Sequence, residues 1–211
     1  KEISPKIQIV IGGPEVSFAN DLPAVCSLVD HIITGPGEVS LPRLCERLLA
    51  GGAVEEKLIT GEVVALGDLK LPYQFYTDDD IRNRLIYVEA SRGCPFKCEF
   101  CLSSLDKTAL PFELGTFLGE MDGLLQRGAR NFKFIDRTFN LKASTSIAIL
   151  ELFLERMSDD LYLHFEVVPD NISEKLKQVL TRFPDNSLQF EIGVQTFDTG
   201  IQKLISRKQN N

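Results

Sequence analysis

Residues 85–101, LIYVEASRGCPFKCEFC, decide how the rest of the chain is interpreted, because an apolar run leads directly into closely spaced cysteines. Cys94, Cys98 and Cys101 are three of the five cysteines in the chain. Thiolates at i, i+4 and i+7 can converge on one metal centre when the loop bends, and Gly93 and Pro95 favour such a bend. The stretch therefore predicts a strand that ends in a metal-binding loop.

A fourth protein ligand is missing from the sequence around these cysteines. A structural zinc site takes four protein ligands, whereas the only histidines, His31 and His164, lie more than sixty residues away with no cysteine beside them. A 4Fe-4S cluster held by three cysteines would keep one iron open for a ligand that is not protein. We therefore favour an iron–sulfur cluster, with zinc or a buried group of thiols as the alternative.

The spacing Cys-x3-Cys-x2-Cys, with Phe100 before the last cysteine and a strand before the first, resembles the radical S-adenosylmethionine (SAM) superfamily. The resemblance implies that Cys94, Cys98 and Cys101 hold a 4Fe-4S cluster and that the backbone around Phe100 meets the adenine of SAM. In that family the open iron chelates the amino and carboxylate groups of SAM. An electron from the cluster then cleaves SAM to a 5′-deoxyadenosyl radical.

Composition sets broader limits on the function. The chain has 211 residues, of which 44% are hydrophobic and 25% charged, so it can bury a sizeable core in one or two domains. A net charge of −7 argues against a nucleic-acid partner, and no apolar stretch is long enough to span a membrane. Unpaired thiols suit the reducing cytoplasm. Because the chain begins at Lys1 and ends just after a helix starts, we expect a fragment of a longer protein.

Residues 1–52 show an α/β rhythm of strand, glycine turn and helix. The β-branched run Ile7–Ile11 ends at Gly12 and Gly13, and a second run, 29–33, leads to a helix that glycines terminate after residue 50. Repeats of this kind predict a doubly wound, Rossmann-like sheet. A phosphate cradle at the glycine turns is an alternative, although neither turn has the full nucleotide fingerprint.

The same segment resembles the C-terminal part of a cobalamin (B12)-binding domain that precedes the catalytic domain in one class of radical SAM proteins. The resemblance implies that Gly12 and Gly13 lie near the nucleotide tail of cobalamin. The Asp-x-His-x-x-Gly motif that supplies the cobalt ligand in that family is absent, and the adjacent pair Asp30 and His31 does not replace it. His31 is therefore expected to be an ordinary strand residue.

Residues 53–84 are expected to form a linker between two domains. Leu58–Ile59 and Val63–Val64 suggest a small hairpin around Thr60–Glu62. Aromatic residues near position 75 are expected to pack the linker against the following domain.

From residue 85 to residue 211, four strand–helix units follow one another. Apolar strands are expected at 85–90, 132–136, 161–168 and 188–194, each followed by a helix with apolar residues at helical spacing. Parallel strands joined by right-handed crossovers curl toward a barrel wall and carry their chemistry at the C-terminal strand ends. The fold class is therefore α/β, a piece of a cobalamin-binding domain followed by a truncated TIM-type radical SAM barrel.

Polar residues stand at these strand ends, where a strand buried on both faces would be apolar. The resemblance implies that Asp136 binds the amino group of SAM and that Glu166 and Gln195 contact its sugar and carboxylate. The alternative is ordinary barrel ion pairs, such as Arg137 with Glu166. His164 shares the parity of Glu166 and could face substrate.

The expected function is that of a radical SAM enzyme in the B12-associated class, acting in methyl transfer or, as an oxidoreductase, in oxidative cyclisation. The class resembles magnesium-protoporphyrin monomethyl ester cyclase-like proteins. A radical SAM enzyme without cobalamin and a zinc-stapled binding module are the alternatives. Expected partners are a small-molecule substrate such as a tetrapyrrole and an electron donor such as flavodoxin or ferredoxin. The edge strand 188–194 is expected either to pair in a homodimer or to be shielded by residues 53–83.

Overall fold

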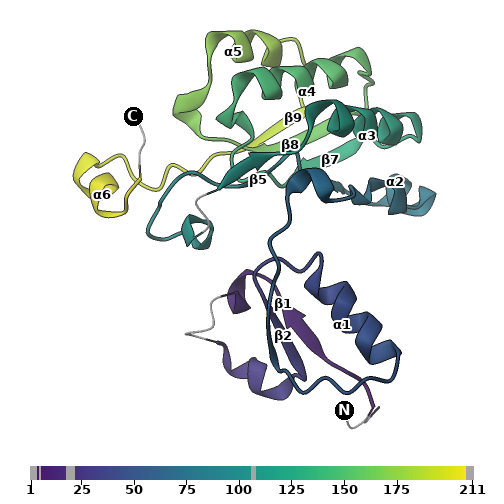
Figure 1. The fold of residues 1–211 in the computed structure, drawn as a ribbon. Coiled ribbons are helices and arrows are strands. Elements are labelled where there is room, and N and C mark those ends of the chain that lie inside the picture. Colours follow the sequence, from purple (N-terminus) through teal and green to yellow (C-terminus); the bar gives the residue numbers. More distant parts are fainter. Residues whose placement is uncertain (1–3, 5, 18–21, 106–107, 208–211) are drawn as a thin grey trace. The chain divides into compact units, whose positions relative to one another are not determined.

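The computed structural model describes residue 4 and residues 6–17, 22–105 and 108–207. The chain divides into two compact units, Lys1–Leu69 and Lys70–Asn211, and the boundary falls inside the predicted linker. Figure 1 shows a parallel sheet in each unit. Parallel α/β architecture, expected from the alternating strands and helices, is therefore confirmed.

The first unit contains a parallel sheet of three strands in the order β1-β2-β3. Its elements are β1 (Val10–Gly12), 3-10 helices Pro14–Val16 and Ala24–Leu28, β2 (His31–Thr34), α1 (Ser40–Leu49), β3 (Leu58–Thr60) and the 3-10 helix Leu66–Asp68. All four residues of the central strand β2 are buried, as expected for a parallel strand covered on both faces. His31 is one of them, and its Nδ1 lies 2.8 Å from the carbonyl oxygen of Glu56, which is the expected structural role.

The predicted hairpin in residues 58–64 is wrong. Leu58–Thr60 instead pairs parallel with β2, with Ile33 opposite Ile59, and residues 61–65 are not in a strand. Gly61 explains the difference, because its N–H donates to the Thr34 carbonyl at 2.6 Å. A Cβ at this position would lie 2.2 Å from the Pro36 carbonyl oxygen. The chain thus continues parallel to β2 after Thr60, whereas a hairpin would reverse its direction.

The second unit contains a parallel sheet of four strands in the order β4-β7-β8-β9 and a separate antiparallel pair, β5-β6. Its strands are β4 (Ile86–Val88), β5 (Ser91–Gly93), β6 (Ala109–Pro111), β7 (Asn131–Phe134), β8 (Tyr162–Glu166) and β9 (Leu188–Glu191). Its α-helices are α2 (Asp78–Asn83), α3 (Leu114–Gln126), α4 (Ala143–Glu155), α5 (Glu174–Leu180) and α6 (Thr199–Leu204). Short 3-10 helices lie at Pro72–Phe75, Leu102–Leu105, Phe139–Leu141 and Pro169–Asn171.

The two faces of this sheet differ in chemistry. Alternate residues point to opposite faces, and helices α3, α4 and α5 lie along one of them (Figure 1). The strand residues in the core on that side are fully or nearly fully buried: Ile86, Val88, Phe132, Phe134, Leu163 and Phe165. The register places the other parity, which includes Lys133, His164, Glu166 and Glu191, on the opposite face. His164 and Glu166, two of the polar residues noticed in the sequence, therefore share the face away from the helices.

The outer edge of β4 is covered by two tyrosine side chains. The Tyr73 hydroxyl accepts from the Glu89 N–H at 2.9 Å and lies 3.3 Å from the Glu89 carbonyl oxygen. The Tyr76 hydroxyl makes the same pair of contacts with Tyr87, at 3.1 and 3.0 Å. These tyrosines lie in the predicted linker, which was expected to shield β9. Within the second unit this part of the segment covers the opposite edge of the sheet, at β4.

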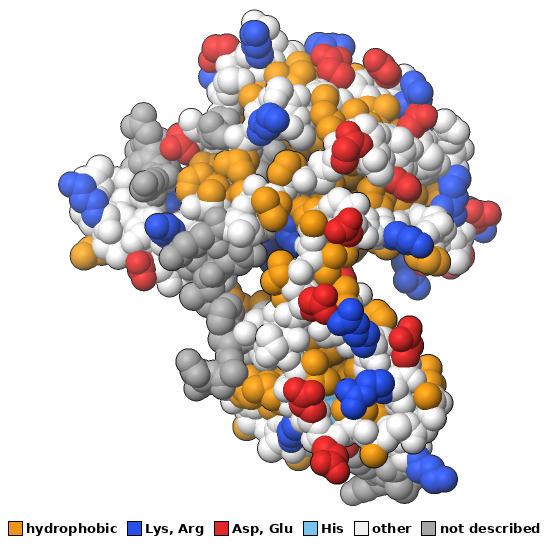
Figure 2. Space-filling model, in the orientation of Figure 1, with side chains coloured by type: hydrophobic (Ala, Val, Ile, Leu, Met, Phe, Trp, Pro, Cys, Tyr) orange, Lys and Arg blue, Asp and Glu red, His pale blue; other side chains and the backbone are white. Residues whose placement is uncertain are grey.

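Two surface findings bear on partners. No helix in the described ranges is both long and apolar enough to cross a membrane. On the face drawn in Figure 2, the Lys and Arg side chains of the described residues are scattered among Asp and Glu and form no continuous basic patch.

Candidate functional site

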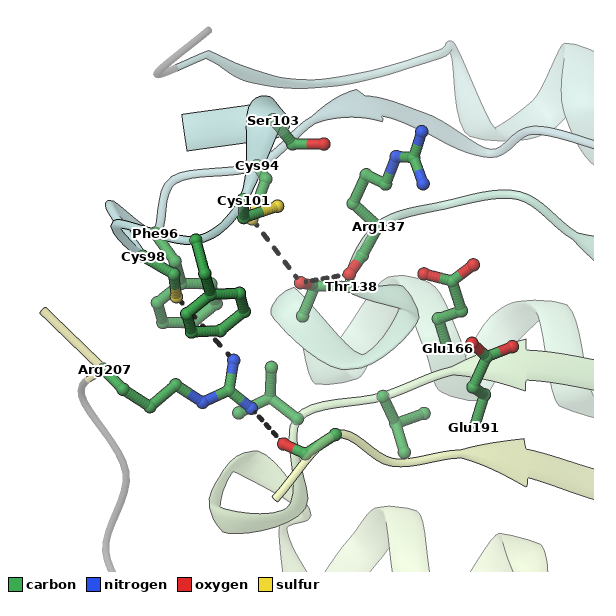
Figure 3. A pocket seen from close by; sticks show the side chains of 14 residues that line it. Cys94, Phe96, Cys98, Cys101, Ser103, Arg137, Thr138, Glu166, Glu191 and Arg207 are labelled. Carbon is green, nitrogen blue, oxygen red and sulfur yellow. Dashed lines mark hydrogen bonds between the residues drawn. The ribbon is translucent and has the colours of Figure 1, made fainter. Parts of the chain in front are cut away.

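The cysteine loop forms one side of a pocket at the C-terminal ends of strands in the second unit (Figure 3). The pocket has a volume of about 210 Å³. It is lined by Cys94, Phe96, Cys98, Phe100, Cys101, Ser103, Arg137, Thr138, Glu166, Val167, Val168, Glu191, Gly193 and Arg207. This position is where parallel α/β sheets bind their ligands.

The loop begins at a glycine that no other residue can replace without a backbone shift. Gly93 ends β5 with φ of 90°, a conformation that favours glycine. A Cβ at Gly93 would lie 2.0 Å from the Thr108 carbonyl oxygen, because β5 and β6 run side by side here. A turn follows, in which the Cys101 N–H donates to the Cys98 carbonyl at 3.1 Å. The local sequence thus presents all three cysteines to one pocket.

The three thiols have few polar contacts of their own. Cys94 Sγ lies 4.0 Å from the Thr138 hydroxyl, and Cys98, which is buried, accepts from the Arg207 guanidinium at 3.8 Å. No disulfide joins any of the five cysteines, all of which lie in the described ranges. Within those ranges, no three Cys, His, Asp or Glu side chains are close enough together to hold a metal ion.

The chemistry of the donor set fits an iron–sulfur cluster. Soft thiolates select zinc or iron–sulfur centres over hard cations. Three thiols line the pocket without a histidine, and the thiols alone are one ligand short of the four that structural zinc needs. These three thiols are therefore the side chains that would hold the predicted cluster.

Arg207 connects the cysteine loop to the segment after α6, and sequence reasoning missed it. One guanidinium nitrogen reaches Cys98, and the other donates to the Gly193 carbonyl at 2.6 Å (Figure 3). The same segment holds the loop through the Glu99 N–H, which donates to the Ile205 carbonyl at 3.0 Å. A single basic residue past the last helix carries no periodic or motif signal that could have identified it.

The other residues predicted to contact SAM or cobalamin come from different parts of the chain. Phe100 and Glu166 line the pocket with the cysteines. Gln195 is not among the lining residues; it follows β9 with φ of 58°. Gly12 and Gly13 belong to the first unit, where Gly12 ends β1 and Gly13 has φ of 104°.

Asp136 is also absent from the pocket lining, because its side chain points into the protein. It is 2% exposed, and its carboxylate accepts from the Ala90 N–H at 3.0 Å and from the Ser91 hydroxyl at 2.6 Å. Burial raises the pKa of this carboxyl from 3.8 to about 6, although the bonds from Ser91 and Ala90 act in the opposite direction.

The polar residues around the pocket form a different arrangement from the expected ion pair of Arg137 with Glu166. In the described part of the chain no salt bridge joins these two side chains, although both line the pocket. Glu191 instead lies 3.5 Å from His164 Nε2 and 3.6 Å from Lys133 Nζ. The His164 Nε2 atom is buried and makes no hydrogen bond within the described residues, and His164 is not among the residues that line the pocket.

Comparison with known proteins gives one sequence relative and a group of similar folds. No family model matches the chain. An uncharacterized methyltransferase, PH0819, from Pyrococcus horikoshii is 27% identical over 171 residues, which cover 71% of this chain and 37% of that protein.

The fold resembles that of TsrM from Kitasatospora setae, a radical SAM methyltransferase. The structure of TsrM with tryptophan substrate and a SAM analogue matches 92% of this chain with a TM-score of 0.64 and 16% identity. The structure of TsrM with cobalamin and a [4Fe-4S] cluster matches with a TM-score of 0.63 and the same identity. In both, the chain spans 43% of the neighbour's length. The likeness establishes a shared fold.

Proposed function

We propose that this chain is part of a radical SAM methyltransferase that holds a 4Fe-4S cluster through Cys94, Cys98 and Cys101. The observation that carries the proposal is that one loop brings three cysteines into a single pocket at the C-terminal edge of a parallel sheet. Thiolates without a fourth protein ligand suit a cluster with one open iron.

The reaction proposed is methyl transfer. The sequence relative and both structural neighbours are named as methyltransferases. None of these three proteins is named as a cyclase or oxidoreductase, so they give the expected oxidative cyclisation no support. TsrM binds cobalamin, and we extend cobalamin to the full-length protein, with Gly12 and Gly13 of the first unit near its nucleotide tail. We also take the second unit as a truncated radical SAM barrel and the first unit as part of a cobalamin-binding domain.

The pocket residues offer complementary groups for SAM. Glu166 and Glu191 carry carboxylates at the ends of β8 and β9, suited to an ammonium or a hydroxyl, and Arg137 carries a guanidinium suited to a carboxylate. Phe96, Phe100, Val167 and Val168 add apolar surface to the lining of the pocket. Gln195 would join the site from the segment beyond β9. When bound, the cluster and SAM would supply an electron and a methyl group.

The proposed reaction needs a methyl acceptor and an electron donor. A small-molecule acceptor, with a tetrapyrrole as one candidate, would take the methyl group. Flavodoxin or ferredoxin would supply electrons. The free thiols suit a reducing, cytoplasmic location.

The test uses the full-length protein after anaerobic reconstitution with iron and sulfide. SAM affinity is measured for the wild type, for Glu166→Gln and for the control Glu174→Gln, which removes an exposed carboxylate on α5. Loss of a charged hydrogen bond should weaken SAM binding to Glu166→Gln by about 1–3 kcal/mol. Equal affinity in both variants would contradict the role of Glu166.

The products identify the reaction. Methyl transfer yields S-adenosylhomocysteine and a methylated acceptor or methylcobalamin. Release of 5′-deoxyadenosine alone would favour the cyclisation alternative and overturn methyl transfer.

A further inference from the structure

The end of β7 reaches back to the start of the cysteine loop through Asp136. One oxygen of its carboxylate accepts from the Ala90 N–H and the other from the Ser91 hydroxyl, and the Ser91 backbone also acts on this carboxylate. Ala90 follows β4, and Ser91 is the first residue of β5. Asp136 therefore joins the middle of the sheet to the two residues that lead into the loop.

Only Arg92 and Gly93 separate these bonds from Cys94. Gly93 is confined by the Thr108 backbone, so β5 has little freedom to adjust on that side. Thr138, two residues after Asp136, lies against Cys94 with its hydroxyl 4.0 Å from the sulfur. The residues after β7 thus contact both the segment that leads into the loop and the first cysteine of the loop.

An ionised carboxylate buried at this position costs folding free energy. Burial without an opposite charge disfavours the ionised form, and no ion pair is seen for Asp136 in the described part of the chain. A small apolar residue would fill the space without that penalty. It would, however, leave the buried Ala90 N–H without an acceptor and release Ser91.

We propose that Asp136 is a positioning residue that holds Ala90 and Ser91 so that Cys94 enters the pocket. It acts through the loop backbone, in place of the SAM contact expected from the sequence. The inference rests on the proposed function, because it assigns Asp136 to the placement of a cluster ligand.

The experiment compares variants at Asp136 with a matched buried clasp on the same segment. Asp136→Leu removes both acceptors, and Asp136→Asn keeps one acceptor and can donate to the Ser91 oxygen. The control is Asn140→Leu. Asn140 is 1% exposed and also clasps a backbone, accepting from the Val168 N–H at 2.9 Å and donating to its carbonyl at 2.7 Å, but at the end of β8.

The first readout is hydrogen exchange in the cofactor-free protein, which needs neither cluster nor SAM. In Asp136→Leu the amides of residues 91–101 should exchange about tenfold faster, the scale expected for losing a buried hydrogen bond. Asp136→Asn should restore most of the protection. Asn140→Leu should leave residues 91–101 near the wild-type rate while loosening the end of β8.

The second readout is iron bound after anaerobic reconstitution, which should fall in Asp136→Leu and recover in Asp136→Asn. Unchanged exchange of residues 91–101 in Asp136→Leu would overturn the proposal. If exchange in β8 rises as much as in the loop, Ser91→Ala serves as the milder variant. Ser91→Ala should speed hydrogen exchange in residues 91–101 and not in β8. An equal rise in exchange in both regions would also overturn the proposal.

The experiment can refute the cluster without refuting the positioning role of Asp136. Faster loop exchange in Asp136→Leu together with no iron bound by any variant, including the wild type, would leave the positioning role intact and refute the cluster.

Discussion

The two edges of the four-stranded sheet are finished in different ways. At the β4 edge, the hydroxyls of Tyr73 and Tyr76 contact the backbone of Glu89 and Tyr87, so each tyrosine replaces the partner that a fifth strand would supply. At the β9 edge, no further strand pairs within the described ranges. A strand edge with unpaired backbone groups is a site for pairing with another chain.

The difference shows that a sheet edge can be closed by side chains from a connecting segment. Burial raises the pKa of Tyr73, so its hydroxyl keeps its proton and can donate as well as accept. Tyrosine is suited to this position because one oxygen serves both the N–H and the carbonyl of one residue. The edge that precedes the cysteine loop is thereby held in place, whereas no strand of the described residues pairs with the outer edge of β9.

The largest expected effect concerns the carboxylate that fastens the end of β4. Because burial raises the Asp136 pKa from 3.8 to about 6, the folded state favours the protonated form. The stability contribution is fully present below pH 3.8 and is lost as pH rises through about 6. Relative to Asp136→Asn, the wild type should lose about 3 kcal/mol of unfolding free energy between pH 3.5 and pH 8.

Urea unfolding of both proteins, followed by circular dichroism across this range, measures the difference. A pH-independent difference between wild type and Asp136→Asn would contradict the raised pKa.

The next largest effect is expected for Tyr73→Phe, which removes the hydroxyl that bonds to the Glu89 backbone at the β4 edge. Tyr73 is 3% exposed, so the change leaves the Glu89 N–H without its acceptor. We expect a loss of about 2 kcal/mol in unfolding free energy, the scale for an unsatisfied buried group. Hydrogen exchange should localise the change to the Glu89 amide, and unaltered protection there would show that the hydroxyl does not cap the edge.

Tyr76→Phe is the matched, weaker test. The Tyr76 hydrogen bonds are more exposed than those of Tyr73, so water can replace the lost hydroxyl. The expected loss is about 1 kcal/mol or less. A loss larger than that of Tyr73→Phe would reverse the proposed order of the two tyrosines.

The smallest expected change in stability tests the open edge. Ile192 directly follows β9 and is 44% exposed, so Ile192→Lys should alter unfolding free energy by only about 0.5 kcal/mol. A lysine beside the edge opposes strand pairing. If copies of the chain pair through β9, sedimentation should show a concentration-dependent dimer in the wild type and not in Ile192→Lys. A dimer that persists in the variant would place the contact elsewhere.

Features set by the local sequence could be predicted, whereas features set by contacts between distant parts of the chain could not. The strands of the second unit were predictable because parallel strands carry apolar runs, and the loop was predictable because three cysteines have a diagnostic spacing. The inward turn of Asp136 was not predictable, since a residue just past a strand can point to either side. The parallel pairing of β3 likewise depended on a close approach of Gly61 to Pro36, a contact between residues far apart in the sequence.

The measurement that tests the central claim most directly is the iron and sulfide content of the full-length protein after anaerobic reconstitution. The wild type should bind about four iron and four sulfide per cluster site, in addition to any other centre. Cys98→Ala should lose them. The control Cys45→Ala, which removes an exposed thiol of the first unit, should keep them. Stoichiometric zinc with no bound iron, or equal iron in Cys98→Ala and Cys45→Ala, would contradict the cluster.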